Sequence, residues 1–266
     1  MVSETWTHAT LALQLLGIDP SLGGITIRAR SGPVRDMLFK QFDVLPQPLQ
    51  KIHPAITDEA LFGGLDLSAT LQSGHLVQNT GLLTQSGTLV LTMAERAPTN
   101  LAARLASALD SGSERLNPKL AERLAFCVDL SDDPLSDAVM PVEADIVKAR
   151  TVTVSCQPNI LHQLTSIAAQ LGIDSMRAPL FALRTARAHA ALAGRTQVEA
   201  TDLEMSCALT FAHRATCVPE PDTQDPPPPN EDNAQDQGEQ TLDLPDELLL
   251  AAVRALLPDN LLDQLT

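Results

Sequence analysis

The sequence is poor in positive charge. Its 266 residues contain 18 Lys and Arg against 33 Asp and Glu, which gives a formal net charge of -15 at pH 7. A protein that binds nucleic acid needs clustered Lys and Arg that outnumber the acids around them, because these side chains neutralise phosphates. The composition therefore argues against a nucleic-acid-binding protein.

The chain also lacks the patterns of membrane, secreted and metal-binding proteins. Its longest apolar runs are far shorter than the roughly 20 residues that span a bilayer. The opening residues, MVSETWTHAT, read neither as a secretory signal nor as a transit peptide. The four cysteines form no C-x-x-C pair, and no histidines have the H-E-x-x-H spacing of a metal site. We expect a protein of the cytoplasm, or of the plastid stroma in a eukaryote, with reduced thiols and no metal site.

The hydrophobic pattern predicts an α/β domain followed by a helical one. Residues 23–29 and 86–93 are typical of buried strands, and CVDL at 127–130 predicts a further short strand. Helices are expected at 5–16, between an N-cap at Asn100 and Gly112, and from an N-cap at Asn117. From about residue 141 the spacing is helical throughout. The last of these helices begins near Thr201, which has capping-box spacing to Glu204.

The last part of the sequence changes character. Residues 219–240 contain six prolines, seven acids and no Lys or Arg, a composition that cannot bury enough apolar surface to fold. Residues 241–266 then predict an amphipathic helix. We therefore expect an α/β domain at 1–140, a helical subdomain at 141–218, a disordered acidic linker at 219–240, and a helix at 241–266 that leads to a C-terminal domain absent from this sequence.

The loop after the first strand lacks the chemistry of a phosphate-binding loop. In ITIRARSGPVRD, residues 25–36, Gly32 is followed by Pro33, which has no N–H, and then by Val34, Arg35 and Asp36. A loop that cradles phosphates needs inward N–H groups and a Lys followed by a hydroxyl. Taken alone, the loop is better explained as a basic turn that starts a helix, although its arginines could bind an anion or a partner's acids.

Several stretches together resemble the D subunits of magnesium chelatase, the enzyme that inserts Mg²⁺ into protoporphyrin IX. The stretches are GGITIRARSGPVRD, GGLDLSATLQSGHLVQNTGLL, GTLVLTMAERAPTNLAARLASALDSG and LGIDSMRAPLFALRTARAHAALAGRTQVEATDLEMS. The resemblance implies a three-layer αβα AAA+ domain that is a degenerate copy of the ATP-hydrolysing I subunit. It also implies a helical lid, an acidic Pro-rich linker and a following integrin-I-like domain.

The same resemblance implies that this copy cannot hydrolyse ATP. The degenerate Walker A motif spans Ser31 to Asp36, with the Lys position near Val34 and the Ser or Thr positions near Arg35 and Asp36. The acid pair of the Walker B motif falls near Thr92 and Met93. Without the Lys ammonium, the Mg²⁺-binding hydroxyl and the acids, the β- and γ-phosphates lose their counter-charge. We expect no cofactor bound by this chain, while the complex as a whole uses ATP and Mg²⁺.

Two arginines match functional positions of the family. Arg123, in LNPKLAERLAF, matches an arginine finger that reaches a neighbour's γ-phosphate, and Arg177, in DSMRAPL, matches the sensor-2 arginine of the lid. The alternative is that each is a surface arginine paired with a nearby acid, for example Glu122 or Asp174. The family's sensor-1 strand has no room in the short SGSERL, 111–116, so either the protein lacks that strand or a stretch is missing there.

The resemblance implies a non-hydrolysing AAA+ platform subunit. Such a subunit would assemble with the I subunit in a ring-shaped hetero-oligomer and couple ATP hydrolysis to Mg²⁺ insertion by the porphyrin-binding H subunit in chlorophyll and bacteriochlorophyll synthesis. One alternative is an active MoxR-like AAA+ ATPase with an unusual loop. Another is a structural adaptor unrelated to chelation. Nucleotide binding and turnover by the isolated chain would separate the first two.

Overall fold

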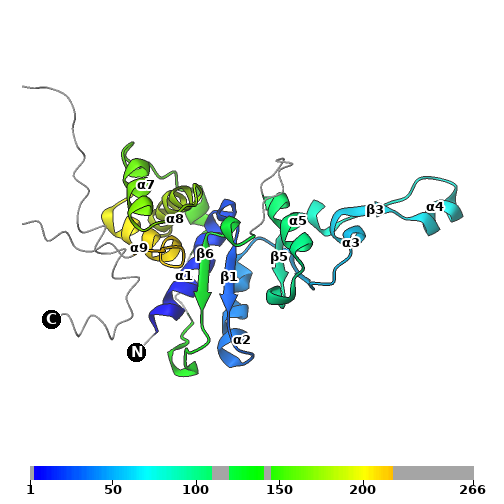
Figure 1. The fold of residues 1–266 in the computed structure, drawn as a ribbon, viewed down its shortest axis with the longest axis horizontal. Helices are drawn as coiled ribbons and strands as arrows, with labels where there is room; N and C mark the ends of the chain where they lie inside the picture. Colours follow the sequence, from blue (N-terminus) through cyan, green and yellow to red (C-terminus); the bar gives the residue numbers. More distant parts are fainter. Residues whose placement is uncertain (1–2, 110–119, 141–144, 218–266) are drawn as a thin grey trace, which may run out of the picture. The chain divides into compact units, whose positions relative to one another are not determined.

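A computed structural model describes residues 3–109, 120–140 and 145–217, which form two compact units (Figure 1). The first unit consists of Met1–Thr153 with Ala191–Arg195, and the second of Val154–Ala190 with Thr196–Thr266. The linker expected at 219–240 and the helix expected at 241–266 lie outside the described residues. Within the described ranges, no helix is long and apolar enough to cross a bilayer.

The first unit alternates strands and helices, as the hydrophobic pattern predicts. Its helices in the described residues are α1 (Glu4–Ile18), α2 (Pro33–Phe39), α3 (Asp58–Phe62), α4 (Leu67–Ser73), α5 (Thr99–Leu109) and α6 (Ile146–Thr151). Its strands are β1 (Ile25–Arg28), β2 (Leu49–Ile52), β3 (Gly63–Leu65), β4 (Gln78–Thr80), β5 (Thr88–Leu91) and β6 (Phe126–Asp129). Short 3₁₀ turns include η1 (Pro20–Leu22), η3 (Leu82–Thr84), η4 (Ala94–Arg96) and η5 (Leu120–Arg123).

The strands form two parallel pairs and one antiparallel hairpin. β1 pairs with β6 in a register that sets Ile25 opposite Phe126 and Arg28 opposite Asp129. β2 pairs in parallel with β5, and β3 pairs with β4 in the antiparallel sense. Among the described residues no strand joins β1 to β5. The α/β class expected from the sequence is confirmed, with its parallel strands in two separate pairs.

Helix α1 packs its apolar face into the first unit. Trp6, Leu13 and Leu16 are buried, and the Trp6 indole N–H donates a hydrogen bond to the Val139 carbonyl at 2.7 Å. At the other end of α1, the Arg150 side chain on α6 donates to the Gly17 carbonyl at 2.6 Å. This contact explains why the first unit continues through α6 to Thr153, beyond the expected boundary at residue 140.

A second apolar cluster lies around β2 and β5. Ile52, Leu61, Leu101 and Leu105 are buried together, with side chains of η3 and β5 packed against them. Helix α5 contributes Leu101 and Leu105 one turn apart, which is the spacing of a helix face that covers a sheet. The cluster holds α3 and η3 against the β2–β5 pair. Since α3 precedes β3 and η3 follows β4, both ends of the β3–β4 hairpin are attached to buried elements.

The second unit is helical. It contains α7 (Ile160–Gln170), most of α8 (Ala178–Leu192) and α9 (Ala200–Thr210), whose buried faces meet in one core. That core includes Leu164, Ile167, Ala182, Ala186 and Phe211. The capping box of α9 joins Glu199 and Asp202, not Thr201 and Glu204 as the sequence suggested, because the helix begins at Ala200. The helical subdomain itself is as expected.

Candidate functional site

The loops that follow β1 and β6 meet at one edge of their parallel pair. Parallel strands end on the same side, and the register sets Arg28 at the end of β1 beside Asp129 at the end of β6. In open α/β sheets this carboxyl edge is where ligands bind. The residues after β1 include Ser31, Gly32 and Pro33, so this edge is the place where a nucleotide site is expected.

The loop after β1 does not form a phosphate cradle. Gly32 has φ 165°, an extended conformation open to any residue, and a Cβ added there would meet no atom within 4 Å. Helix α2 then starts at Pro33, which has no N–H, and Asp36 donates its N–H to the Gly32 carbonyl at 3.1 Å. Val34, at the Lys position of the family, is partly buried. The loop therefore offers neither converging N–H groups nor an ammonium.

Arg35 is engaged within its own helix turn. Its guanidinium donates to the Ser31 hydroxyl at 3.0 Å and lies 3.5 Å from the Asp36 carboxylate. The same group lies 5.7 Å from the centre of the Phe39 ring, within the range of a cation–π contact. The Arg35 guanidinium is thus in contact with the hydroxyl and the carboxylate of its own loop and helix turn.

The other arginines of this edge also face acids of the same subunit. Arg28 lies 3.8 Å from the Asp129 carboxylate, and Arg30 lies 3.4 Å from the Asp132 carboxylate. Hydrogen bonds from Ser131, first from its side chain and then from its N–H, lower the pKa of Asp129, and Arg28 adds to this effect. Asp129 is therefore ionised at neutral pH. The edge carries paired charges of both signs and no concentrated positive field for a triphosphate.

The end of β5 lacks the acids that hold Mg²⁺ in an active copy. The Thr92 hydroxyl and N–H both donate to the Ile52 carbonyl of β2, each at 3.1 Å. Met93 follows with φ 53° and starts η4. The first acid after the strand is Glu95, which is exposed and lies 3.9 Å from the Arg96 side chain. Thr92 therefore closes the strand end in place of a carboxylate.

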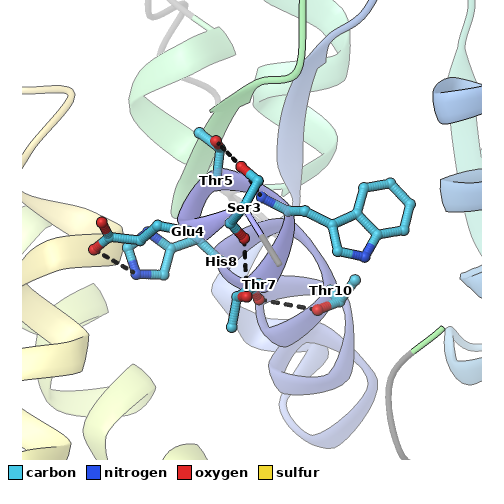
Figure 2. A network of polar contacts seen from close by, with 7 residues as sticks. Ser3, Glu4, Thr5, Thr7, His8 and Thr10 are labelled. Carbon is cyan, nitrogen blue, oxygen red and sulfur yellow. Dashed lines mark hydrogen bonds and ion pairs between the residues drawn. The ribbon is translucent and has the colours of Figure 1, made fainter. Parts of the chain in front are cut away.

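The start of α1 is fixed to the loop after β6. The Ser3 and Thr5 hydroxyls donate to one oxygen of Asp133, at 2.6 and 3.0 Å. Figure 2 shows these two side chains in contact with each other and Glu4 beside His8, which lies one turn further along α1. The Glu4 carboxylate and the His8 ring are 3.8 Å apart. Burial lowers the pKa of His8, and the Glu4 charge offsets this only in part. The carboxyl edge is thus bordered by α1 as well as by the two loops.

Arg123 lies at the end of η5 and is buried, with 3% of its surface exposed. Its backbone is closely packed, because a Cβ on Gly23 would lie 2.1 Å from the Arg123 carbonyl oxygen, and Ala125 donates its N–H to the Leu22 carbonyl at 3.1 Å. A finger must reach out of its own subunit, and this conformation encloses the side chain. The burial also differs from the alternative of an arginine on a helix surface. The expected helix start at Asn117 lies outside the described residues.

Arg177 belongs to the second unit. It immediately precedes α8, is partly buried, and its carbonyl accepts the N–H of Phe181 in the first turn. Arg177 is thus placed at the start of α8, and its sensor-2 role stays a prediction. Among the described residues, no group of three or more His, Cys, Asp or Glu could hold a metal ion.

Comparisons with known proteins agree with this architecture. A family model described as the AAA lid domain matches residues 161–237. A putative ATPase from Cytophaga hutchinsonii has a similar structure, with a TM-score of 0.52 at 12% identity over 81% of this chain and 83% of that one. At that identity the likeness supports the fold alone. The fold and the lid match define the class: this chain has an AAA+ type of fold with a helical lid.

The sequence relatives are more specific. The chain is 42% identical over 288 residues to the magnesium-chelatase 60 kDa subunit of Cereibacter sphaeroides, covering 98% of this chain and 51% of the relative. It is 40% identical to the subunit of the same name from Rhodobacter capsulatus, covering 96% and 50%. The resemblance to magnesium chelatase D subunits is confirmed: the chain is a relative of these subunits and spans about half of their length.

Sequence reasoning found the degenerate loop and strand end but missed the contacts that occupy them. Nothing in the residues RARSGPVRD shows that Arg28 faces Asp129 at the end of β6 and that Arg30 faces Asp132 in the following loop. Both acids lie about a hundred residues further along the chain. A signal was available in part, because SDDP follows CVDL and parallel strands end at the same edge.

Proposed function

We propose that this chain is the AAA+ part of a non-hydrolysing platform subunit of magnesium chelatase. It assembles with the ATPase I subunit in a ring-shaped hetero-oligomer and couples ATP hydrolysis there to Mg²⁺ insertion into protoporphyrin IX by the H subunit. Mg²⁺ is the substrate metal of this reaction. The proposal places the chain in the cytoplasm, where the I subunit meets its ATP.

One observation carries the proposal: the residues that follow β1 and those that follow β5 include no catalytic group at the required position. Val34 and Pro33 stand where a Lys and an N–H are needed, and Thr92 donates to Ile52 where a carboxylate is needed. The two positions follow different strands, so one unusual loop does not account for both. A MoxR-like ATPase needs both sets of groups, and no described contact favours it.

The test is reconstitution with the I subunit. We expect the purified chain to hydrolyse no ATP by itself, to bind the I subunit, and to change the rate at which the I subunit hydrolyses ATP. The matched control is the I subunit with bovine serum albumin at the same concentration. Turnover of MgATP by the chain alone would overturn the platform role. Failure to bind the I subunit would favour an adaptor unrelated to chelation.

Arg123 and Arg177 are the candidates to act on a neighbour's nucleotide. For Arg123 the proposal requires that assembly exposes a side chain that is buried in the isolated chain. Arg123→Ala should therefore leave binding to the I subunit intact and lower the ATPase rate of the complex. Thermal unfolding of the free variant separates the two roles, because a purely structural arginine would lower the melting temperature and leave the rate of the assembled complex unchanged. Arg177→Ala is the parallel test for the lid.

A further inference from the structure

The hairpin of the first unit is a well-defined element with no described core of its own. We call residues 63–80, which hold β3, α4 and β4, the arm. Figure 1 shows it running out from α3. Helix α4 has no buried residue, and all three residues of β4 are exposed. Packing of an apolar core therefore does not explain why the arm has a fixed fold.

The neck of the arm depends on two glycines. A Cβ on Gly81 would lie 2.1 Å from the Phe62 carbonyl carbon and 2.2 Å from the Gly63 nitrogen. Gly63 has φ +85°, and a Cβ there would lie 2.3 Å from the Asn79 carbonyl oxygen. The two chain segments therefore approach each other more closely than any other residue type allows. Below the neck, Asp58 of α3 pairs with Arg104 of α5 and fixes the base.

Local hydrogen bonds hold the rest of the arm. The Asp66 carboxylate accepts the Ala69 N–H at 2.9 Å, which caps α4, and the Asn79 side-chain N–H at 3.3 Å from β4. These bonds, with the Ala69 N–H first, lower the pKa of Asp66, so it is ionised at neutral pH. The Thr70 hydroxyl accepts the N–H of Val77 at 3.1 Å. Polar groups thus fold the arm and leave its apolar side chains outside.

Those apolar side chains gather on and beside α4. Leu71 is 84% exposed, Leu76 is 75% exposed and Leu67 is 65% exposed, and Leu65 and Phe62 are exposed nearer the neck. Leu67 and Leu71 are four residues apart and share a helix face. Exposed apolar side chains grouped on one ordered element mark an interaction surface.

The charged side chains of α3 and the arm are all acidic, and one of them, Asp58, is paired with Arg104 of α5. Between Lys51 and Arg96 the sequence has no Lys or Arg, whereas Asp58, Glu59 and Asp66 lie in or next to the arm. A second copy of this chain fits poorly, because each copy has a net charge of -15. A membrane surface also fits poorly, because lipid-binding elements place Lys and Arg beside their apolar face. The complementary surface is an apolar groove bordered by Lys and Arg.

We propose that the arm inserts its exposed leucines into an apolar groove, bordered by Lys or Arg, on a neighbouring protein subunit of a different kind. This inference deepens the proposed function and rests on it, since that function supplies the neighbour, the I subunit. Leu71 and Leu76 make the central contacts, and the acids Glu59 and Asp66 set the orientation. The fixed neck means that the arm binds without an ordering cost.

The test compares a double variant of the arm with a matched variant elsewhere. Leu71→Ser with Leu76→Ser should weaken binding of the full chain to the I subunit by about tenfold or more, measured by isothermal titration calorimetry. Leu135→Ser with Val147→Ser, two exposed apolar residues outside the arm, should leave it within about twofold. All four side chains are exposed, so the melting temperature should stay unchanged in both. Higher salt should weaken binding of the unmodified chain.

The possible failures are distinguishable. If the unmodified chain does not bind the I subunit, the proposed function fails and this inference fails with it. If the unmodified chain binds and the arm variant binds equally well, the inference alone fails. Sedimentation of the chain as a dimer that the arm variant abolishes would overturn it in favour of a second copy. Arm-dependent binding to neutral phosphatidylcholine vesicles would overturn it in favour of a membrane.

Discussion

Gly32 is a glycine in the place of a phosphate-binding loop, but its backbone does not require glycine. Its φ of 165° is extended, and a Cβ there would meet nothing within 4 Å. We predict that Gly32→Ala changes the free energy of unfolding by less than about 0.5 kcal/mol. It should also leave the ATPase rate of the complex with the I subunit unchanged. Urea denaturation and the ATPase assay check this, and a large loss in either would show that the loop binds a ligand or changes conformation.

His8 gives the first unit a dependence on pH. Burial lowers its pKa in the folded chain below the ordinary value of 6.5, with Glu4 opposing the shift. As pH falls through about 6.5, the unfolded chain takes up a proton that the folded chain resists, so stability is lost toward acid. We predict that His8→Gln reduces the drop in melting temperature between about pH 7.5 and about pH 5.5.

Glu4→Gln is the matched control for this pH dependence. It removes the charge that raises the His8 pKa, so the fall of stability toward acid should become steeper than in the unmodified chain. Equal slopes in all three proteins would mean that the His8 environment is the same in the folded and unfolded states.

At the scale of elements, the start of α9 allows a test of two capping residues, Asp202 in the structure and Glu204 from the sequence pattern. Asp202 is fully buried, accepts the Glu199 N–H at 2.9 Å and lies 2.6 Å from His189. Removing it leaves these groups without their acceptor. We predict that Asp202→Ala lowers the free energy of unfolding of the second unit by about 2 kcal/mol or more. Glu204→Ala, at the position that the sequence suggested, should cost less than about 0.5 kcal/mol.

The neck of the arm gives a second prediction at this scale. Gly81→Ala sets a Cβ against backbone atoms of Phe62 and Gly63, which cannot move aside as a side chain can. We predict a loss of about 2 kcal/mol or more of unfolding free energy. Gly74→Ala is the comparison, because Gly74 has φ +67° and open space around it, so only the left-handed backbone, about 1 kcal/mol, opposes the change. Equal losses would show that the neck widens freely.

The elements also show which features a sequence reveals. The strands at 25–28 and 88–91 and the lid helices are continuous local patterns, and the structure confirms them. The arm has no such local pattern, because its polar and apolar residues follow neither the helix nor the strand period. Strand β2 was not predicted, because the four residues LQKI show no strand pattern by themselves and are held as a strand by pairing with β5. The burial of Arg123 depends on packing between distant segments, which no local pattern encodes.

At the scale of the whole molecule, the absence of a Lys from the loop after β1 and of an acid pair after β5 predicts that nucleotide does not stabilise the isolated chain. A ligand that binds only the folded state raises the melting temperature, by an amount that grows with the ratio of its concentration to its dissociation constant. We predict that millimolar MgATP leaves the melting temperature of the isolated chain unchanged, whereas it raises that of the I subunit assayed in parallel. A clear increase for this chain would require an ATP site within it.

The separation of the parallel strands into two pairs agrees with the short segment at 111–116, where the family has a further strand. The expected sensor-1 strand has no room at 111–116, and no described strand joins β1 to β5. The alignment with the relative from Cereibacter sphaeroides runs over 288 residues, more than the 266 of this chain, so that relative has residues that this chain lacks. Local patterns could predict which strands exist, but not whether they close into one sheet.

Because Trp6 is bonded to Val139, its fluorescence reports the folding of the first unit. Trp6 is the single tryptophan, so the tryptophan fluorescence of the chain comes from the first unit alone. Because the indole is buried and bonded to the segment that follows β6, its emission should follow the docking of α1. Circular dichroism, by contrast, records the helices of both units. Comparing the two signals in one melt would show whether the lid and the α/β unit unfold together.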